Sequence, residues 1–200
     1  NMDPVRIERA ITKKTKAILP VHVFGLPCDM DPIRKIARKH RLTVIEDACE
    51  AIGATYKGRK TGRFGKCGVF AFYPNKQMTT GEGGMLVTDD LKVAEMARSL
   101  RNQGRGKSGG WLEHVRLGYN YRLDEMSCAL GRSQLARLPS ILKRRAAVAA
   151  EYHRLLRKIP GIGLLETPRG LTRSWFVYVV VLPKGVSRDF VIRKLAAAGI

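Results

Sequence analysis

Lys76 has the most unusual surroundings of any charged residue in this sequence. An apolar and aromatic run, 68–73, leads into it, and a glycine-rich turn, 81–84, follows it. Apolar neighbours desolvate an ammonium ion and so favour the neutral amine. A neutral lysine amine is a nucleophile that forms imines with carbonyl compounds. The alternative is a lysine that closes a strand and extends its amine to water, and for a lysine taken alone that alternative is favoured.

Asp47 is the second candidate, because it directly follows the apolar run 43–45. The carboxyl ends of strands in open α/β sheets are where ligands bind. A carboxylate there can pair with a protonated ring nitrogen of a bound molecule. It can equally cap the turn 48–51 by accepting a backbone hydrogen bond. On these residues alone the two interpretations are evenly balanced.

A polar and aromatic stretch, 117–124, precedes a long helical pattern and holds further candidates. Asn120 and Arg122 have side chains that can bind phosphate, arginine through paired donors. The alternative is an entry loop capped by Asp124. His22 lies at the end of an apolar run, and we expect it to be a buried histidine with satisfied hydrogen bonds.

Capping residues, prolines and apolar runs divide the sequence into alternating strands and helices. This alternation predicts an α/β fold with a largely parallel sheet. We expect residues 1–138 to be part of a large domain, and 139–200 to be a linking helix and the start of a smaller α/β domain. The expected strands are 17–23, 43–45, 67–72, 85–88 and 175–182, and the expected helices are 4–11, 31–41, 89–100, 124–138, 139–157 and a last one capped by Ser187.

The formal net charge of +20 is compatible with binding to nucleic acid or another polyanion. The basic residues are, however, spread along the chain and lie mostly on the polar sides of expected helices. Aromatic residues do not interleave with them as a base-stacking surface requires. We therefore expect that nucleic acid is not a partner.

The location of the protein is expected to be cytoplasmic. No stretch has the apolar length of a membrane span, and no signal peptide is visible. The four cysteines are widely spaced, which argues against a zinc site or disulfides, and the histidines show no metal-ligand spacing. The sequence begins with Asn1 and stops within a helical pattern, 190–200, so we expect an internal piece of a longer protein, truncated at both ends.

Taken together, these runs resemble the DegT/DnrJ/StrS family of sugar aminotransferases, which use pyridoxal 5'-phosphate (PLP). Glu46-Asp47-Ala48 and the run 72–76 are specific as a pair, whereas either alone would be weak. The resemblance covers nearly the whole chain in the order of the family. The matching runs are 20–25, 44–48, 68–76, 81–89 and 117–131.

The resemblance implies the type I PLP-dependent aminotransferase fold and roles for individual residues. It makes Lys76 the catalytic Schiff-base lysine and Asp47 the partner of the pyridine nitrogen. Glu50 occupies a cofactor-binding position at which the family usually has glutamine or histidine. Ala71 replaces a serine that often binds the cofactor phosphate, so other groups must hold it.

The resemblance also implies a homodimer with shared active sites, in which Asn120 reaches the cofactor phosphate of the neighbouring subunit. Arg122 and Tyr121 become candidates for substrate binding. The family's remaining phosphate loop would precede Asn1, so this stretch alone is expected to bind PLP poorly and to be inactive.

The function implied is transfer of an amino group from glutamate or glutamine to a keto group of a nucleotide-linked sugar. One alternative is a PLP-dependent nucleotide-sugar dehydratase. Some such relatives replace the lysine by histidine, so Lys76 favours transamination. The other alternative is a non-catalytic regulatory or nucleic-acid-binding protein that uses the basic surface.

Overall fold

A computed structural model describes residues 1–107 and 113–200 of the chain. The helices are α1 (Pro4–Ala10), α2 (Met30–Lys39), α3 (Leu91–Arg101), α4 (Glu125–Leu156) and α5 (Arg188–Ala197), with a 3-10 turn, η1 (Val23–Gly25). The strands are β1 (Ala17–Ile18), β2 (Thr43–Asp47), β3 (Thr55–Tyr56), β4 (Arg59–Lys60), β5 (Cys67–Ala71), β6 (Gly84–Val87), β7 (Gly163–Leu164), β8 (Leu171–Thr172) and β9 (Val180–Val181).

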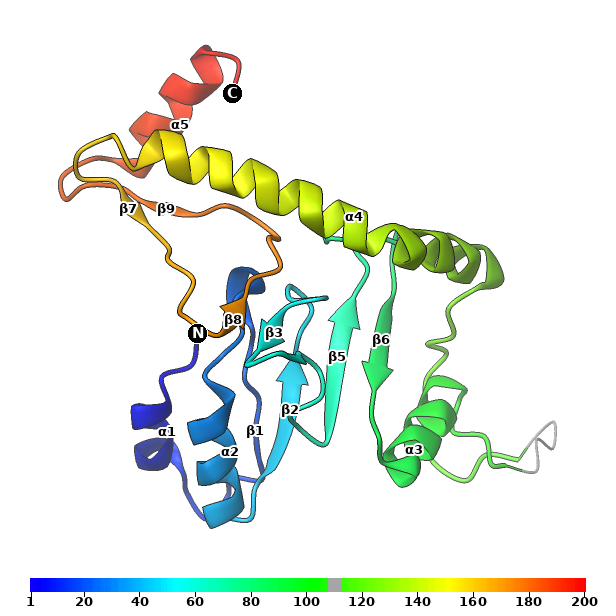
Figure 1. Cartoon of the computed structure of the whole chain (residues 1–200). Coiled ribbons are helices and arrows are strands. Elements are labelled where there is room, and N and C mark those ends of the chain that lie inside the picture. Colours follow the sequence, from blue (N-terminus) through cyan, green and yellow to red (C-terminus); the bar gives the residue numbers. More distant parts are fainter. Residues whose placement is uncertain (108–112) are drawn as a thin grey trace.

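The main sheet has the strand order β1-β2-β5-β6. Strands β1, β2 and β5 are parallel, and β6 returns antiparallel to β5. The mixed α/β fold with a mainly parallel sheet is therefore confirmed. Figure 1 shows α1 and α2 beside β1 and β2, while α4 passes the upper end of β5.

Two clusters of buried side chains hold these elements together. In α2, Met30, Ile33 and Ala37 lie on one face at helical spacing and are buried against β1 and β2. The second cluster joins α4 to the chain that follows β5, because Leu138 packs with Phe72 and Met78. This second contact places α4 beside the turn that carries Lys76.

The expected strand 17–23 is wrong beyond Ile18. Pro20 has no N–H to donate to a ladder, and Val21 makes only an isolated bridge to Asp47. At Phe24 and Gly25 the backbone has positive φ angles of 55° and 76°, which turns the chain away from the sheet.

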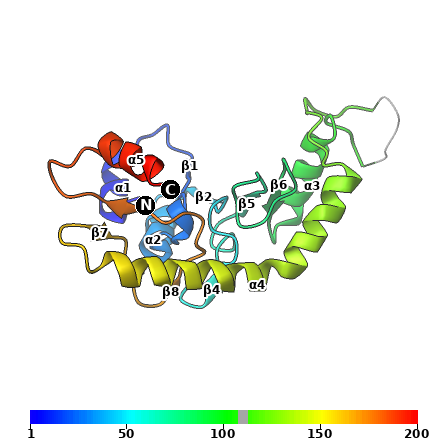
Figure 2. The same ribbon diagram turned by 90° about the horizontal axis from the view of Figure 1, so that it is seen from above.

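The expected helix break at Pro139 is also wrong, because α4 continues through Pro139. A proline inside a helix removes one backbone hydrogen bond and bends the axis. Figure 2 shows this bend, since the green and yellow parts of α4 run in different directions. The Ser140 hydroxyl donates to the Arg137 carbonyl at 2.8 Å and so satisfies one acceptor in this turn. The division into domains at residue 138 stays a prediction.

The expected strand 175–182 shrinks to β9. The carbonyls of Trp175 and Phe176 accept hydrogen bonds from the Arg145 side chain instead of from a neighbouring strand. Two helix starts move by one or two residues, because Asp29 precedes α2 and Asp90 caps α3. The caps at Asp3, Asp124 and Ser187 are confirmed.

The C-terminal part of the chain pairs with a hairpin that forms much earlier in the sequence. Strand β8 pairs with β3 and thereby extends the β3–β4 hairpin to three strands. Strands β7 and β9 form a separate antiparallel pair. Within the described residues, no helix has the length and apolar character needed to cross a membrane.

Candidate functional site

The carboxyl ends of β2 and β5 bring three predicted site residues into one region. Asp47 is the last residue of β2, and Glu50 lies in the turn that follows. Lys76 lies in the turn after β5, where its N–H donates to the Tyr73 carbonyl at 3.0 Å. Because β2 and β5 are parallel neighbours, their carboxyl ends meet at one edge of the sheet.

Lys76 is largely buried, with 15% of its side chain exposed. Its Nζ lies 3.6 Å from Glu50 Oε1 and 4.3 Å from the ring centroid of Phe176. A carboxylate and an aromatic face both stabilise an ammonium ion. The surroundings therefore differ from the purely apolar ones that residues 68–73 suggest, since a carboxylate and an aromatic ring from other segments contact the amine.

The Glu50 carboxylate is fixed from its other side. Its Oε2 accepts a hydrogen bond from the Phe24 N–H at 2.7 Å. Phe24 belongs to η1, whose positive φ angle of 55° lets that N–H face the turn after β2. One oxygen of Glu50 thus binds backbone while the other faces Lys76.

Asp47 caps the turn that follows β2, as the second interpretation of this residue supposes. Its Oδ1 accepts a hydrogen bond from the Cys49 N–H at 3.1 Å. Burial, reinforced by the Asp47 carboxylate, raises the pKa of the Cys49 thiol to about 12, while the charge of Lys76 acts in the opposite direction. The cap uses Oδ1 and leaves Asp47 Oδ2 outside this bond.

Arg145 and Gln77 connect Lys76 to segments that the sequence gave no reason to place there. The Arg145 guanidinium donates to the carbonyls of Lys76 at 3.3 Å and of Phe176 at 3.1 Å. Gln77 Nε2 donates to the Glu50 carbonyl and to Ser174 Oγ. Sequence reasoning missed Arg145, Phe176 and Ser174, because each comes from a segment far along the chain and carries no local motif.

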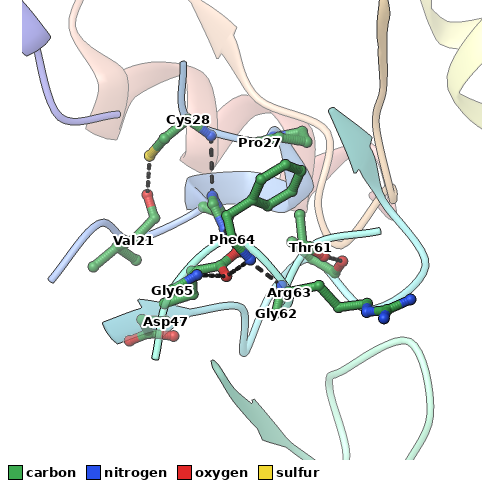
Figure 3. Close-up of polar contacts among 12 residues, drawn as sticks. Val21, Pro27, Cys28, Asp47, Thr61, Gly62, Arg63, Phe64 and Gly65 are labelled. Carbon is green, nitrogen blue, oxygen red and sulfur yellow. Dashed lines mark hydrogen bonds and ion pairs between the residues drawn. The ribbon is translucent and has the colours of Figure 1, made fainter. Parts of the chain in front are cut away.

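Glu46 holds the end of β2 through a buried set of hydrogen bonds. It accepts from His22 Nε2 at 3.1 Å and from the backbone N–H groups of Gly62 at 2.8 Å, Gly65 at 2.9 Å and Phe64. Burial acts to raise the pKa of Glu46, but these donors outweigh it and lower that pKa. Figure 3 shows Gly62, Phe64 and Gly65 gathered around these contacts.

His22 is the buried, satisfied histidine that its position in the sequence predicts. Its side chain is fully buried, and its Nδ1 accepts a hydrogen bond from the Cys28 N–H at 3.0 Å. That acceptor role requires a neutral imidazole whose Nε2–H is donated to Glu46. His22 therefore supports the β2 end rather than taking part in chemistry.

Asn120, Tyr121 and Arg122 lie exposed on the segment between α3 and α4. The Tyr121 N–H donates to the Arg101 carbonyl at 2.9 Å, and Arg122 Nη1 donates to Asn102 Oδ1 at 3.0 Å. These contacts tie the three residues to the end of α3, and the structure does not bring them to Lys76 within this chain. Ala71, at the end of β5, pairs with Gly84 of β6.

The comparison with known families is decisive at this point. The chain matches the DegT/DnrJ/EryC1/StrS aminotransferase family over residues 1–200. It belongs to that family. The expected family membership is therefore confirmed, and Lys76, Asp47 and Glu50 are the residues of this DegT/DnrJ/EryC1/StrS member that meet at the sheet edge.

Two named relatives and one further structure show what this family member is similar to. It is 43% identical to the GDP-perosamine synthase of Caulobacter vibrioides, covering 100% of this chain and 54% of that protein. It matches S. venezuelae DesV, solved in complex with a ketimine intermediate, with a TM-score of 0.91 and 44% identity, over 100% of this chain and 52% of DesV.

The third is the E. coli GDP-4-keto-6-deoxy-D-mannose-3-dehydratase with bound hydrated PLP. The TM-score is 0.91 at 30% identity, over 100% of this chain and 56% of that one. The aminotransferase fold is thus confirmed. The chain spans about half the length of these proteins.

Proposed function

We propose that this protein transfers an amino group from an amino acid to a keto group of a nucleotide-linked sugar, with PLP held at Lys76. The observation that carries the proposal is the placement of Asp47 at the carboxyl end of β2 and of Lys76 in the turn after the neighbouring parallel strand β5, where Lys76 pairs with Glu50. The names of the relatives support a nucleotide-linked sugar as the substrate, because one of them is a GDP-perosamine synthase.

The side chains present fit PLP in their chemistry. A primary amine is the group that can bind the cofactor aldehyde covalently, and Lys76 supplies it from a site with restricted access to water. A carboxylate is the group that can stabilise a protonated pyridine nitrogen, and Asp47 supplies one with Oδ2 outside its turn cap. Ala71 offers no side-chain donor to a phosphate, so that part of the cofactor must be held by other groups.

PLP, when bound, supplies an electron sink for the bonds at the α-carbon of the amino donor. Lys76 would hold the cofactor through its amine and would move a proton to and from the α-carbon of the amino donor as general base and acid. Asp47 keeps the pyridine nitrogen protonated. Lys76 and Asp47 would play the same two roles in the reverse steps, which pass the nitrogen to the sugar ketone.

Two neighbouring side chains position Lys76 for its role as general base and acid. Arg145 fixes its carbonyl, and the Phe176 ring covers its amine, which limits the access of water. The amino donor is glutamate or glutamine, and the enzyme works as a cytoplasmic homodimer in this proposal. The net charge of +20 adds a general attraction for a diphosphate-linked substrate.

The first test adds PLP to the whole protein and records the visible absorption band of the imine. Lys76→Ala is expected to abolish this band, because no lysine amine then remains in the site to bind the aldehyde. Lys92→Ala, which removes an exposed lysine of α3, is the matched control and should keep it. A band of unchanged intensity in Lys76→Ala would contradict the assignment of Lys76.

The second test uses Asp47→Asn, which keeps the size of the side chain and its acceptor oxygen. The variant is expected to retain part of the PLP band but to lose about 10²-fold or more in turnover, because the ring nitrogen no longer faces a negative charge. Full turnover would show that Asp47 serves only as the cap for Cys49.

The same preparations separate the two alternative functions. A transaminase would leave the nitrogen of the amino donor on the sugar product, whereas a dehydratase would release a sugar that has lost an oxygen and carries no added nitrogen. A non-catalytic nucleic-acid-binding protein would show no imine band and would bind DNA or RNA with a steep dependence on salt. The similarity to the E. coli dehydratase makes the nitrogen content of the sugar product the important measurement.

A further inference from the structure

Three short runs of the chain, 12–16, 34–42 and 63–67, together hold ten lysines and arginines and no aspartate or glutamate. The runs are far apart in the sequence, but the fold gathers them at one edge of the main sheet, which is called the basic edge below. We propose that this basic edge binds an anionic lipid surface and docks the protein there through charge. The inference goes beyond the proposed function and does not depend on the binding of PLP.

Parallel strand pairing brings the three runs together. The first run leads into β1, the second covers the end of α2 and leads into β2, and the third leads into β5. Because these strands are parallel neighbours, their amino ends lie at the same edge of the sheet. The Thr43 N–H donates to the Lys16 carbonyl at 3.3 Å, and the Lys66 N–H donates to the Val44 carbonyl at 2.7 Å. Figure 1 shows the end of α2 and the starts of β1 and β2 together at the lower end of the molecule.

Most cations of the basic edge have no carboxylate to neutralise them. Three of the ten form ion pairs: Lys39 with Glu8, Arg63 with Asp89, and Lys66 with Asp90. The other seven have no ion pair among the residues that the structure describes, and six of these seven are exposed. A dense group of exposed like charges creates a positive potential that attracts an anionic surface.

The make-up of the basic edge favours lipid headgroups over nucleic acid or a protein partner. Proteins that bind single-stranded nucleic acid stack its bases on exposed aromatic side chains. The one aromatic residue of the three runs, Phe64, is buried in the core. The runs also contain no exposed large apolar side chain of the kind found at the centre of a protein–protein interface. Anionic headgroups need neither feature, because lysine and arginine attract them by charge within a Debye length.

The candidate site lies at the other edge of the same sheet. Asp47 and the turn that carries Lys76 are at the carboxyl ends of β2 and β5, whereas the basic edge is at their amino ends. A protein docked through the basic edge would therefore keep this site turned away from the lipid. Dissolved substrates could then reach Lys76 while the protein is bound.

The experiment sediments the whole protein with lipid vesicles at low salt. One set of vesicles is phosphatidylcholine alone, and the other is phosphatidylcholine mixed with an equal part of phosphatidylglycerol. The protein is expected to sediment only with the anionic vesicles and to be released as salt is added, because the attraction is screened. No sedimentation with the anionic vesicles would overturn the proposal.

Two variants of equal net charge separate the basic edge from the overall charge of the protein. The first changes four exposed cations of the basic edge: Lys13→Gln, Lys14→Gln, Lys35→Gln and Arg38→Gln. The matched control changes four exposed cations at and beyond the end of α4: Lys143→Gln, Arg157→Gln, Lys158→Gln and Lys184→Gln. The basic-edge variant is expected to bind anionic vesicles about tenfold more weakly or worse, and the control by less than about threefold. Equal losses in the two variants would mean that only the total charge matters and would overturn the proposal.

A footprint on the unaltered protein locates the bound surface without any variant. Acetic anhydride labels lysines with and without anionic vesicles, and peptide mass spectrometry reads each position. Lys13, Lys14 and Lys35 should lose labelling severalfold on the vesicles, while Lys158 and Lys184 keep it. Protection at Lys158 and Lys184 that equals or exceeds protection at the basic edge would contradict the proposal.

Duplex DNA at the same phosphate concentration serves as the competing ligand. DNA that fails to displace the protein from the vesicles supports the lipid surface as the partner. DNA that binds more tightly than the vesicles, and loses that binding in the basic-edge variant, would make this edge a nucleic-acid site and reject the lipid proposal. None of these measurements uses PLP, so a failed imine test would leave their outcome unaffected.

Discussion

Glu46 shows how a single buried carboxylate can organise an active-site edge. It directly precedes Asp47 and collects donors from His22 and from the loop 62–65. A buried carboxylate is costly unless its acceptors are satisfied, and here backbone donors supply most of that satisfaction. The position of Asp47 therefore depends on Glu46, the preceding residue of β2, whose side chain points to the opposite face of the sheet.

Glu46→Gln is expected to lower the free energy of unfolding at pH 7 by about 1–3 kcal/mol, because an amide N–H₂ faces buried donors. The pKa of Glu46 is lowered in the folded protein, so its contribution is complete above its ordinary value of 4.5 and is lost as pH falls below that value. Urea unfolding between pH 3 and pH 7 tests this.

The difference between the original protein and Glu46→Gln should therefore shrink in acid. Glu151→Gln removes an exposed carboxylate that pairs with Arg154 and should leave the unfolding midpoint nearly unchanged at pH 7. A Glu46→Gln protein as stable as the original at pH 7 would show that the loop 62–65 does not depend on this acceptor.

Lys76 and Asp47 can be found from the sequence because each lies in or just after an apolar run that ends in a polar turn, whereas Glu50 is singled out only by the resemblance to the family. The contacts that differ from the expected apolar surroundings of Lys76 come from segments far along the chain. Phe176 and Arg145 reach Lys76 only after α4 has carried the chain past the sheet, and a contact of that kind leaves no periodic signal. Pro139 misleads for a similar reason, since the packing of Leu138 holds α4 together across a residue that normally ends helices.

At the scale of elements, the segment 173–176 is joined to η1 and to the turn after β2 by backbone contacts. The Ser174 N–H donates to the Gly25 carbonyl at 2.9 Å, and Ser174 Oγ donates to the Ile52 carbonyl at 2.6 Å. The approach at Gly25 is so close that a Cβ there would lie 1.6 Å from the Ser174 carbonyl oxygen. Glycine is therefore required for this junction.

Gly25→Ala is expected to detach the segment that carries Phe176 from the site. Gly58→Ala is the matched control, because Gly58 has nearly the same φ angle, 78° against 76°, with open space around it. In the control, the free energy of unfolding should fall by only about 1–2 kcal/mol, which is the cost of a positive φ angle for alanine. Urea unfolding should show a clearly larger loss for Gly25→Ala.

Trypsin gives an independent measurement of the same change. Arg173 is 7% exposed and should become a new cleavage site in Gly25→Ala but not in Gly58→Ala. Equal stability and equal cleavage of the two variants would mean that Ser174 moves aside without consequence.

At the scale of the whole molecule, the segment 117–122 is tied to the end of α3 and carries exposed side chains. Leu117 and Tyr121 are among its most exposed side chains, at 84% and 72%. In the proposed homodimer, Asn120 would reach the cofactor phosphate of the partner.

A mixture of Lys76→Ala and Asn120→Ala subunits tests this sharing. Each variant alone is expected to lose most of its transaminase activity. A mixed dimer contains one site that draws both residues from unaltered chains, so unfolding and refolding the two together should restore a measurable fraction. No recovery from a mixture that forms dimers would place Lys76 and Asn120 in the same subunit's site or show that Asn120 has no role.

The pairing of β8 with β3 has a consequence for how the chain acquires its structure. The hairpin around Lys57 and Gly58 is complete early in synthesis, yet its third strand begins only at Leu171. Pairing between such distant residues is slow to form, because a long loop must close first. The hairpin edge and the amine of Lys76 therefore lack their partners from the last segment until residues 171–176 have left the ribosome, so a lysine that can react with aldehydes stays exposed during that interval.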